Sequence, residues 1–215
     1  MAERTDGIKG KFSVALGLTD YVNPILYTIT SATIVTHIGE VMQLPWSAIY
    51  VAGAAVSIVC GFAIPTVKLL VGLGKIPFSL PVSLVLCVNS GIFASGLMLA
   101  RATFGLGTLP FLGIVAATGV VLALIYRQTG KFNNVAVLVG FVGYLLIYAS
   151  LITRSIQAGR ALPVALFAVA ICLFLMLVGI GLKADLKNAR VHWVIEISNI
   201  VCQALVAAGT VILFA

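Results

Sequence analysis

The chain has 215 residues, of which 61% are hydrophobic and 9% are charged, and its formal net charge is +7. Soluble domains average about 25% charged residues, so a chain with a mean hydropathy of +1.19 could not keep its apolar surface out of water. The basic residues lie in short loops between apolar runs, which excludes nucleic acid as the reason for the positive charge. We therefore expect an all-α, multi-pass integral membrane protein whose main partner is the lipid bilayer.

Seven apolar runs follow one another along the chain, each near the ~20 residues that a helix needs to cross a bilayer. The predicted spans are 12–38, 46–67, 77–99, 109–126, 133–152, 161–182 and 191–214. The fourth span is the least regular, because glycine and proline residues, Pro110 among them, fall in and just before its first half. The prediction is a polar N-terminal tail over 1–11, then one helical domain over 12–215 that forms a bundle of about seven transmembrane helices.

The Lys and Arg residues divide unevenly between the two ends of these spans. Three lie at one end, Arg101, Arg154 and Arg160. The other ten lie at the opposite end: Arg4, Lys9, Lys11, Lys68, Lys75, Arg127, Lys131, Lys183, Lys187 and Arg190. Because short cytoplasmic loops carry an excess of Lys and Arg, this predicts a cytoplasmic N-terminus and an external C-terminus. We expect the plasma membrane of a bacterium or archaeon.

Small residues recur every four positions in two of the spans. Gly53, Ser57 and Gly61 do so in the second span, and Gly91 and Ser95 do so in the third. Such small-residue ridges let another helix approach closely. Ridges occupied by the chain's own helices would be simple packing, whereas ridges left free would indicate a subunit of a larger complex.

The residue types that usually bind metals or cofactors are poorly placed for it. The four cysteines all lie in apolar segments and lack CxxC spacing, so we expect small buried hydrophobes without disulfides. The chain has two histidines, His37 and His192, at opposite ends of the predicted bundle, where they could not ligate one metal or haem. The sequence therefore predicts no metal site and no cofactor.

Two of the six acidic residues, Asp20 and Glu196, lie within predicted spans. A carboxylate inside a membrane segment costs roughly 2.5 kcal/mol or more, so by default it faces a protein interior or a water-filled cavity. The first and seventh spans run in the same direction, and both carboxylates lie in the cytoplasmic third, each followed three residues later by an asparagine, Asn23 or Asn199. No basic residue is predicted at that depth. We therefore expect the two carboxyl groups to share one site, within ~10 Å of each other.

Other polar residues continue the same helix faces toward the middle of the membrane. Tyr27 follows Asn23 by four positions, Gln203 follows Asn199 by four, and the third span contributes Asn89 and Ser90. Carboxylate, amide and hydroxyl oxygens suit a proton or a small cation. Pro24 frees a backbone carbonyl in this region, as in the broken helices of transporters. The predicted pathway between the first, third and seventh helices consists of Asp20, Asn23, Tyr27, Asn89, Ser90, Glu196, Asn199 and Gln203.

The leading functional hypothesis is a small transport protein, either a channel, a carrier or a substrate-binding membrane subunit. One alternative is a structural or assembly subunit, in which the polar face contacts another copy of the chain or a different membrane protein. An intramembrane enzyme is a third class, but no nucleophile–base pair is visible and no catalytic residue is predicted. For the individual residues, Asp20 could lie at the membrane surface, Glu196 could pair with His192, and Asn89, Asn199 and Gln203 could form hydrogen bonds between helices.

Overall fold

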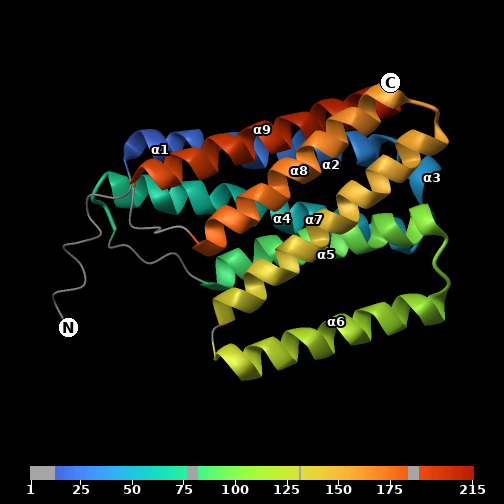
Figure 1. Ribbon diagram of the computed structural model, residues 1–215, viewed down its shortest axis with the longest axis horizontal. Coiled ribbons are helices and arrows are strands. Elements are labelled where there is room, and N and C mark those ends of the chain that lie inside the picture. Colours follow the sequence, from blue (N-terminus) through green and yellow to red (C-terminus); the bar gives the residue numbers. More distant parts are fainter. Residues whose placement is uncertain (1–12, 77–81, 131, 184–188) are drawn as a thin grey trace.

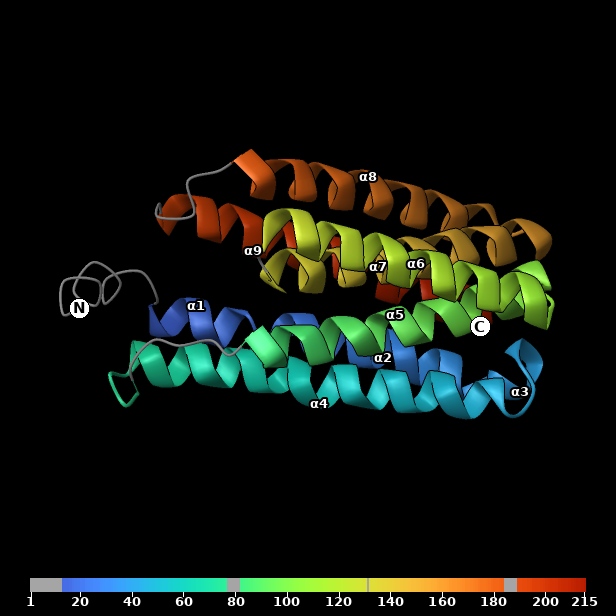
Figure 2. The same cartoon turned by 90° about the horizontal axis from the view of Figure 1, so that it is seen from below.

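In a computed structural model of the chain, residues 13–76, 82–130, 132–183 and 189–215 are described, and these residues form helices joined by short turns, without strands (Figure 1). The helices are α1 (Val14–Thr19), α2 (Val22–Thr36), α3 (Ile38–Val41), α4 (Trp46–Gly72), α5 (Val82–Phe104), α6 (Thr108–Thr129), α7 (Phe132–Gln157), α8 (Ala161–Lys183) and α9 (Ala189–Phe214). The long helices run roughly parallel or antiparallel to one another along a common axis (Figures 1 and 2).

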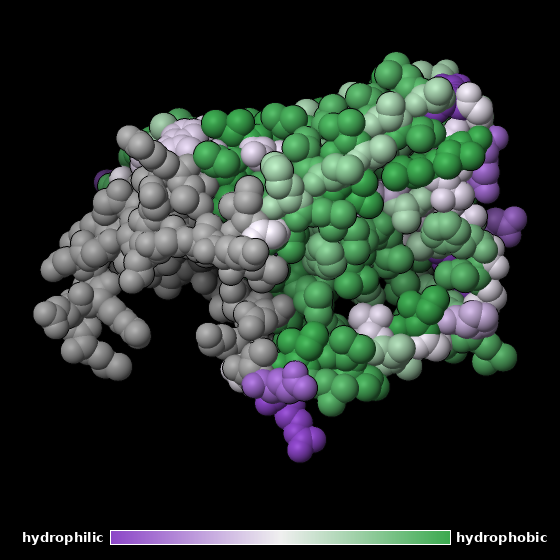
Figure 3. Space-filling view, viewed as in Figure 1, coloured by the Kyte–Doolittle hydropathy of each residue, from purple (hydrophilic) through white to green (hydrophobic). Residues whose placement is uncertain are grey.

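Six of the described helices are long and apolar enough to cross a membrane, with apolar stretches of 19 to 27 residues. At ~1.5 Å per residue, even the shortest of these stretches approaches the ~30 Å of a bilayer's hydrocarbon core. Large apolar side chains point outward along them, and Figure 3 shows a hydrophobic surface over the helices with hydrophilic residues toward the edges. The prediction of an all-α, multi-pass membrane protein is confirmed.

The first predicted span, 12–38, is a broken helix rather than a continuous one. α1 ends at Thr19 and α2 begins at Val22, and together they run along the bundle beside α4 (Figure 2). Pro24 lies in the first turn of α2, where its missing N–H is tolerated, but the carbonyl of Asp20 thereby loses its usual donor four residues on. The helix is therefore interrupted next to Asp20, the first of the two carboxylates predicted to lie within spans.

The small-residue ridges of the second and third spans face each other. A Cβ atom added to Gly53 on α4 would lie 2.9 Å from the Gly91 carbonyl oxygen on α5, too close for any larger residue. Ser57 on α4 also donates a hydrogen bond of 2.9 Å to the carbonyl of Val88 on α5. The predicted close helix contact is present, and the chain's own helices occupy it.

The fourth predicted span, 109–126, is the continuous helix α6 despite its glycines. Pro110 lies in the first turn, where a helix does not need its N–H, and Gly113 and Gly119 have no atom of a neighbouring helix within 4 Å of an added Cβ. α6 contacts α7 at the margin of the bundle, and of its large apolar side chains Phe111 is buried (Figure 1).

Candidate functional site: a lysine between two carboxylates

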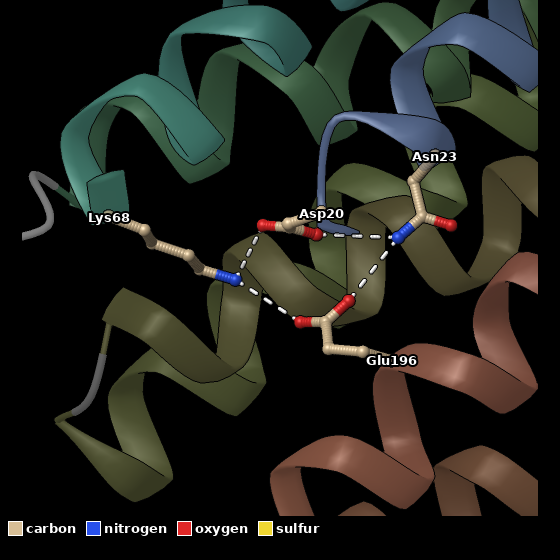
Figure 4. A network of polar contacts seen from close by, with 4 residues as sticks. All are labelled: Asp20, Asn23, Lys68 and Glu196. Carbon is tan, nitrogen blue, oxygen red and sulfur yellow. Dashed lines mark hydrogen bonds and ion pairs between the residues drawn. The ribbon is translucent and has the colours of Figure 1, made fainter. Parts of the chain in front are cut away.

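A cluster of three charged side chains lies at the end of the bundle where α1 begins. The ammonium nitrogen of Lys68 is 2.7 Å from an oxygen of Asp20 and 3.2 Å from an oxygen of Glu196. Figure 4 shows Lys68 reaching from α4 toward Asp20, at the end of α1, and Glu196, on α9. The three side chains are between 10 and 15% exposed. Because one nitrogen contacts both carboxylates, the predicted proximity of Asp20 and Glu196 is confirmed.

Asn23 joins the same two carboxylates from the other side. Its Nδ2 atom donates to Oδ1 of Asp20 and to Oε2 of Glu196, each at 3.3 Å. Ionised carboxylates only accept hydrogen bonds, so the NH₂ group of the amide faces them. The oxygen of the amide then points away from the cluster, and this Oδ1 atom is buried without a hydrogen-bond partner (Figure 4).

The local sequence explains how these side chains meet. Asp20 caps α1 and Asn23 begins the next turn, so the interrupted helix presents both to the same neighbours. Lys68 lies one turn beyond Pro65, a buried proline inside α4. Pro65 has no N–H for the carbonyl of Gly61, just as Pro24 has none for the carbonyl of Asp20. Two backbone carbonyls near the cluster thus lack their helical donors.

The expectation that no basic residue lies at the depth of the carboxylates is wrong. The predicted second span ends at residue 67, just after Pro65, and this boundary puts Lys68 in a loop. In the structure α4 continues to Gly72, so Lys68 is a helical residue within the bundle. The signal in the sequence is the apolar run Leu69, Leu70 and Val71, which extends the span past the lysine.

Next to the charged cluster is a cavity of about 160 Å³ inside the bundle. Five residues of the predicted pathway line it: Asp20, Asn23, Tyr27, Asn199 and Gln203. The rest of the wall includes Ser57, Gly61 and Pro65 of α4, Val88 and Ile92 of α5, and Tyr144 of α7. The sequence pattern does not predict that residues of α4 and α7 line this cavity. For the ridge of Gly53, Ser57 and Gly61 on α4, it predicts only a close contact with another helix.

Tyr27 extends the polar wall toward the middle of the bundle. Its side chain is 7% exposed, and its hydroxyl is a buried polar atom without a hydrogen-bond partner. Buried polar groups are normally satisfied by protein or ordered water. Tyr27 Oη and Asn23 Oδ1 are thus two buried polar atoms without a hydrogen-bond partner, on residues that line the same cavity.

The structure does not bring Asn89 and Ser90 to this cavity. Asn89 Nδ2 donates a 2.9 Å hydrogen bond to the carbonyl of Ala136 on α7, and its side chain fits against Gly140, where no Cβ is present. Ser90 is exposed on the outer surface of α5. Asn89 therefore forms a hydrogen bond between helices, the alternative role considered for it. The charged cluster is carried by the first, second and seventh predicted spans, without the third.

Both acidic side chains have partners inside the bundle. Asp20 is 7% exposed within the protein, in contact with Lys68 and Asn23, rather than at an open surface. Glu196 pairs with Lys68, while the side chain of His192 lies outside the described residues. Among the residues that the structure describes, no three His, Cys, Asp or Glu side chains gather as a metal site would require.

Fold and site together define a multi-pass α-helical membrane protein with an internal, charged polar site. A scan against models of known protein families, a search of curated proteins and a search of solved structures each found no match.

Proposed function

We propose that the protein is a small membrane transporter that binds a proton or a monovalent cation at the Asp20–Lys68–Glu196 cluster. The observation that carries this proposal is the unequal charge of the cluster. Two carboxylates share one ammonium, so with all three groups ionised the site holds one unit of negative charge. One proton or one monovalent cation makes the cluster neutral, and neutrality matters here because an uncompensated charge away from water is costly.

The cavity supports a transport role because it continues the charged cluster into the bundle. About 160 Å³ has room for several waters or for a solute of roughly the size of benzene. Asp20 is part of this wall, as are the polar residues Tyr27, Asn199 and Gln203. A small ion leaving the carboxylates would therefore pass polar residues as well as apolar ones such as Val88 and Ile92.

A structural or assembly subunit has less support. The polar face of α9 that suggested a partner contacts α2 and α4 of the same chain through Asn23 and Lys68. Gly53 and Ser57 of α4 pack against the small residues of α5, and Gly61 faces Pro24 of α2. Contacts with other copies or other chains are thus not needed to explain either feature.

The orientation of the protein is part of the same proposal. Lys68 belongs to the buried cluster rather than to a loop, and removing it from the count leaves nine basic residues against three. This excess supports a cytoplasmic N-terminus, with the charged cluster nearer the cytoplasmic side and the C-terminus outside.

A flux assay in proteoliposomes tests the proposal. The purified protein is reconstituted with an internal pH-sensitive dye, and a potassium gradient with valinomycin drives protons inward; a second assay imposes a sodium gradient. We expect ion flux above that of empty liposomes in one assay, and a decrease of about tenfold or more in Glu196→Gln, because the amide keeps the shape but removes the charge.

Glu40→Gln is the matched control. Glu40 is an exposed acid on α3, at the far end of the bundle from the cluster, so its neutralisation should leave the flux unchanged. A folded Glu196→Gln protein with normal flux, or wild-type protein without flux of either ion, would contradict the proposal.

A further inference from the structure

At the opposite end of the bundle, Arg101 holds a positive charge that no acidic side chain of the described residues neutralises. Arg101 lies in the last turn of α5, with its guanidinium carbon 4.0 Å from the ring centroid of Trp46 and 5.1 Å from that of Phe111. Its Nη1 atom is buried without a hydrogen-bond partner. The ion pairs present in the described part of the chain are those of Lys68 at the other end.

Contacts with aromatic rings do not use up the hydrogen-bond donors of a guanidinium. The guanidinium carbon of Arg101 lies over both the Trp46 and the Phe111 ring, and a cation–π contact of this kind needs no acceptor atom. The two rings therefore hold the group in place, and its N–H donors have no acceptor among the described residues. A planar fork of N–H donors is the arrangement that binds phosphate and carboxylate oxygens in pairs.

A pocket of about 270 Å³ adjoins this group. Val41, Met42 and Gln43 form one wall, from the segment that joins α3 to α4, and Gly105 and Leu106 after α5 form another. Gln43 is exposed and adds a side-chain amide to the lining. The pocket therefore combines a fixed cation with a neutral hydrogen-bonding group.

A second guanidinium stands behind the pocket wall. Arg154 on α7 donates to the carbonyl of Val41 at 3.1 Å and to the hydroxyl of Thr103 at 2.8 Å, both of them neutral acceptors. Glu40, the neighbouring acid in sequence, is exposed and forms no ion pair with described residues. Two positive charges thus lie close to one pocket that no described carboxylate neutralises.

We propose that the Arg101 pocket binds a phosphate group. The pocket lies at an end of the membrane-spanning helices, where both the headgroup phosphate of a lipid and a phosphate-bearing solute can reach it. The chemistry of recognition is the same for both sources: an anionic oxygen pair accepts from the edge of Arg101, and Arg154 adds long-range attraction. This site is separate from the charged cluster, and its proposal does not depend on transport.

Trp46 offers a direct test because it contacts the binding group. The chain has two tryptophans, so Trp193→Phe leaves Trp46 as the single tryptophan, which is excited selectively over the tyrosines at about 295 nm. The Trp193→Phe protein in detergent is titrated in one arm with inorganic phosphate and in the other with dihexanoyl phosphatidic acid, with dihexanoylglycerol as the lipid that lacks phosphate. We expect a saturable change of Trp46 fluorescence in at least one phosphate arm and none with dihexanoylglycerol.

Three variants separate binding from folding. Arg101→Gln should weaken phosphate binding by about tenfold or more, and Arg101→Lys should weaken it less, because it keeps the charge but loses the fork. Arg160→Gln is the control, since Arg160 lies at the same end and donates to the carbonyl of Ile212, away from this pocket; it should bind normally.

The two arms also identify the source of the phosphate. A response to inorganic phosphate supports a soluble phosphate-bearing ligand, and a response to phosphatidic acid alone supports a lipid headgroup. The proposal is overturned if Trp46 responds in neither arm, if dihexanoylglycerol gives the same response as phosphatidic acid, or if Arg101→Lys and Arg160→Gln lose binding equally.

Discussion

Asn23 and Glu196 are 173 positions apart in the chain, yet Nδ2 of Asn23 lies 3.3 Å from Oε2 of Glu196. The same nitrogen also donates to Asp20, so one neutral amide and one ammonium hold two carboxylates together. Among the described residues, these contacts are the polar connections between the interrupted first helix and the last helix.

Replacing Asn23 with aspartate should therefore be more damaging than replacing it with leucine. Leucine removes two hydrogen bonds to charged groups, each contributing about 1.5–3 kcal/mol. Aspartate removes them too and adds a third carboxylate to a site that already has an excess of negative charge. Thermal unfolding in detergent should rank the proteins as wild type, Asn23→Leu and Asn23→Asp, from most to least stable. An Asn23→Asp protein as stable as wild type would show that the amide does not bridge the acids.

Removing Lys68 should cost about 3–5 kcal/mol, because Lys68→Met leaves both carboxylates without a cation. Adding Glu196→Gln to the same protein removes one of the two unpaired charges, so the double variant should recover part of the lost stability. Thermal unfolding of the single and double variants measures this coupling. Strictly additive losses would mean that Lys68 and Glu196 do not interact.

The fold and part of this site can be predicted from the sequence because both depend on features of single segments of the chain. The apolar runs determine which segments cross the membrane, and the position of Asp20 and Glu196 within their spans determines their depth. Equal depth, parallel direction and an asparagine three residues on are enough to predict one shared site.

Two features cannot be predicted in this way because they depend on packing. Depth says nothing of the direction in which a side chain points around the helix axis, so Asn89 is expected in the cavity although it faces α7. Lys68 falls outside a span that ends near Pro65, since a proline is a usual place for a helix to stop. A buried proline inside α4 is tolerated because neighbouring helices and the cavity surround the carbonyl that it frees.

The contact between α4 and α5 predicts a large difference between two glycine substitutions. A Cβ at Gly91 would overlap Ser57 and the Gly53 carbonyl, so Gly91→Ala should separate the helices and lower stability by about 1–3 kcal/mol. Gly113→Ala on α6 is the matched control: nothing lies within 4 Å of its added Cβ, and alanine favours the helix by up to about 1 kcal/mol. Thermal unfolding should show opposite signs, and a harmless Gly91→Ala would contradict the close contact.

The proposed orientation can be tested by labelling single cysteines in a variant without the four native ones. Lys131→Cys and Lys187→Cys should react with a membrane-impermeant maleimide only after permeabilisation, because the sequence predicts both residues on the basic, cytoplasmic side. A cysteine added after Ala215 should react in intact cells. Labelling of the C-terminal cysteine only after permeabilisation would mean that the number of crossings is even.

The first described helix begins at one end of the bundle and the last helix finishes at the other, as the positions of α1 and of the C-terminus show (Figure 2). A head-to-tail gene fusion of two copies would therefore start its second half at the opposite end of the bundle. If that half crossed the membrane in the opposite sense, against its own excess of Lys and Arg, the product would have two halves related by an axis in the membrane plane, the symmetry of inverted-repeat transporters. A duplication with the same orientation would need one additional crossing between the halves.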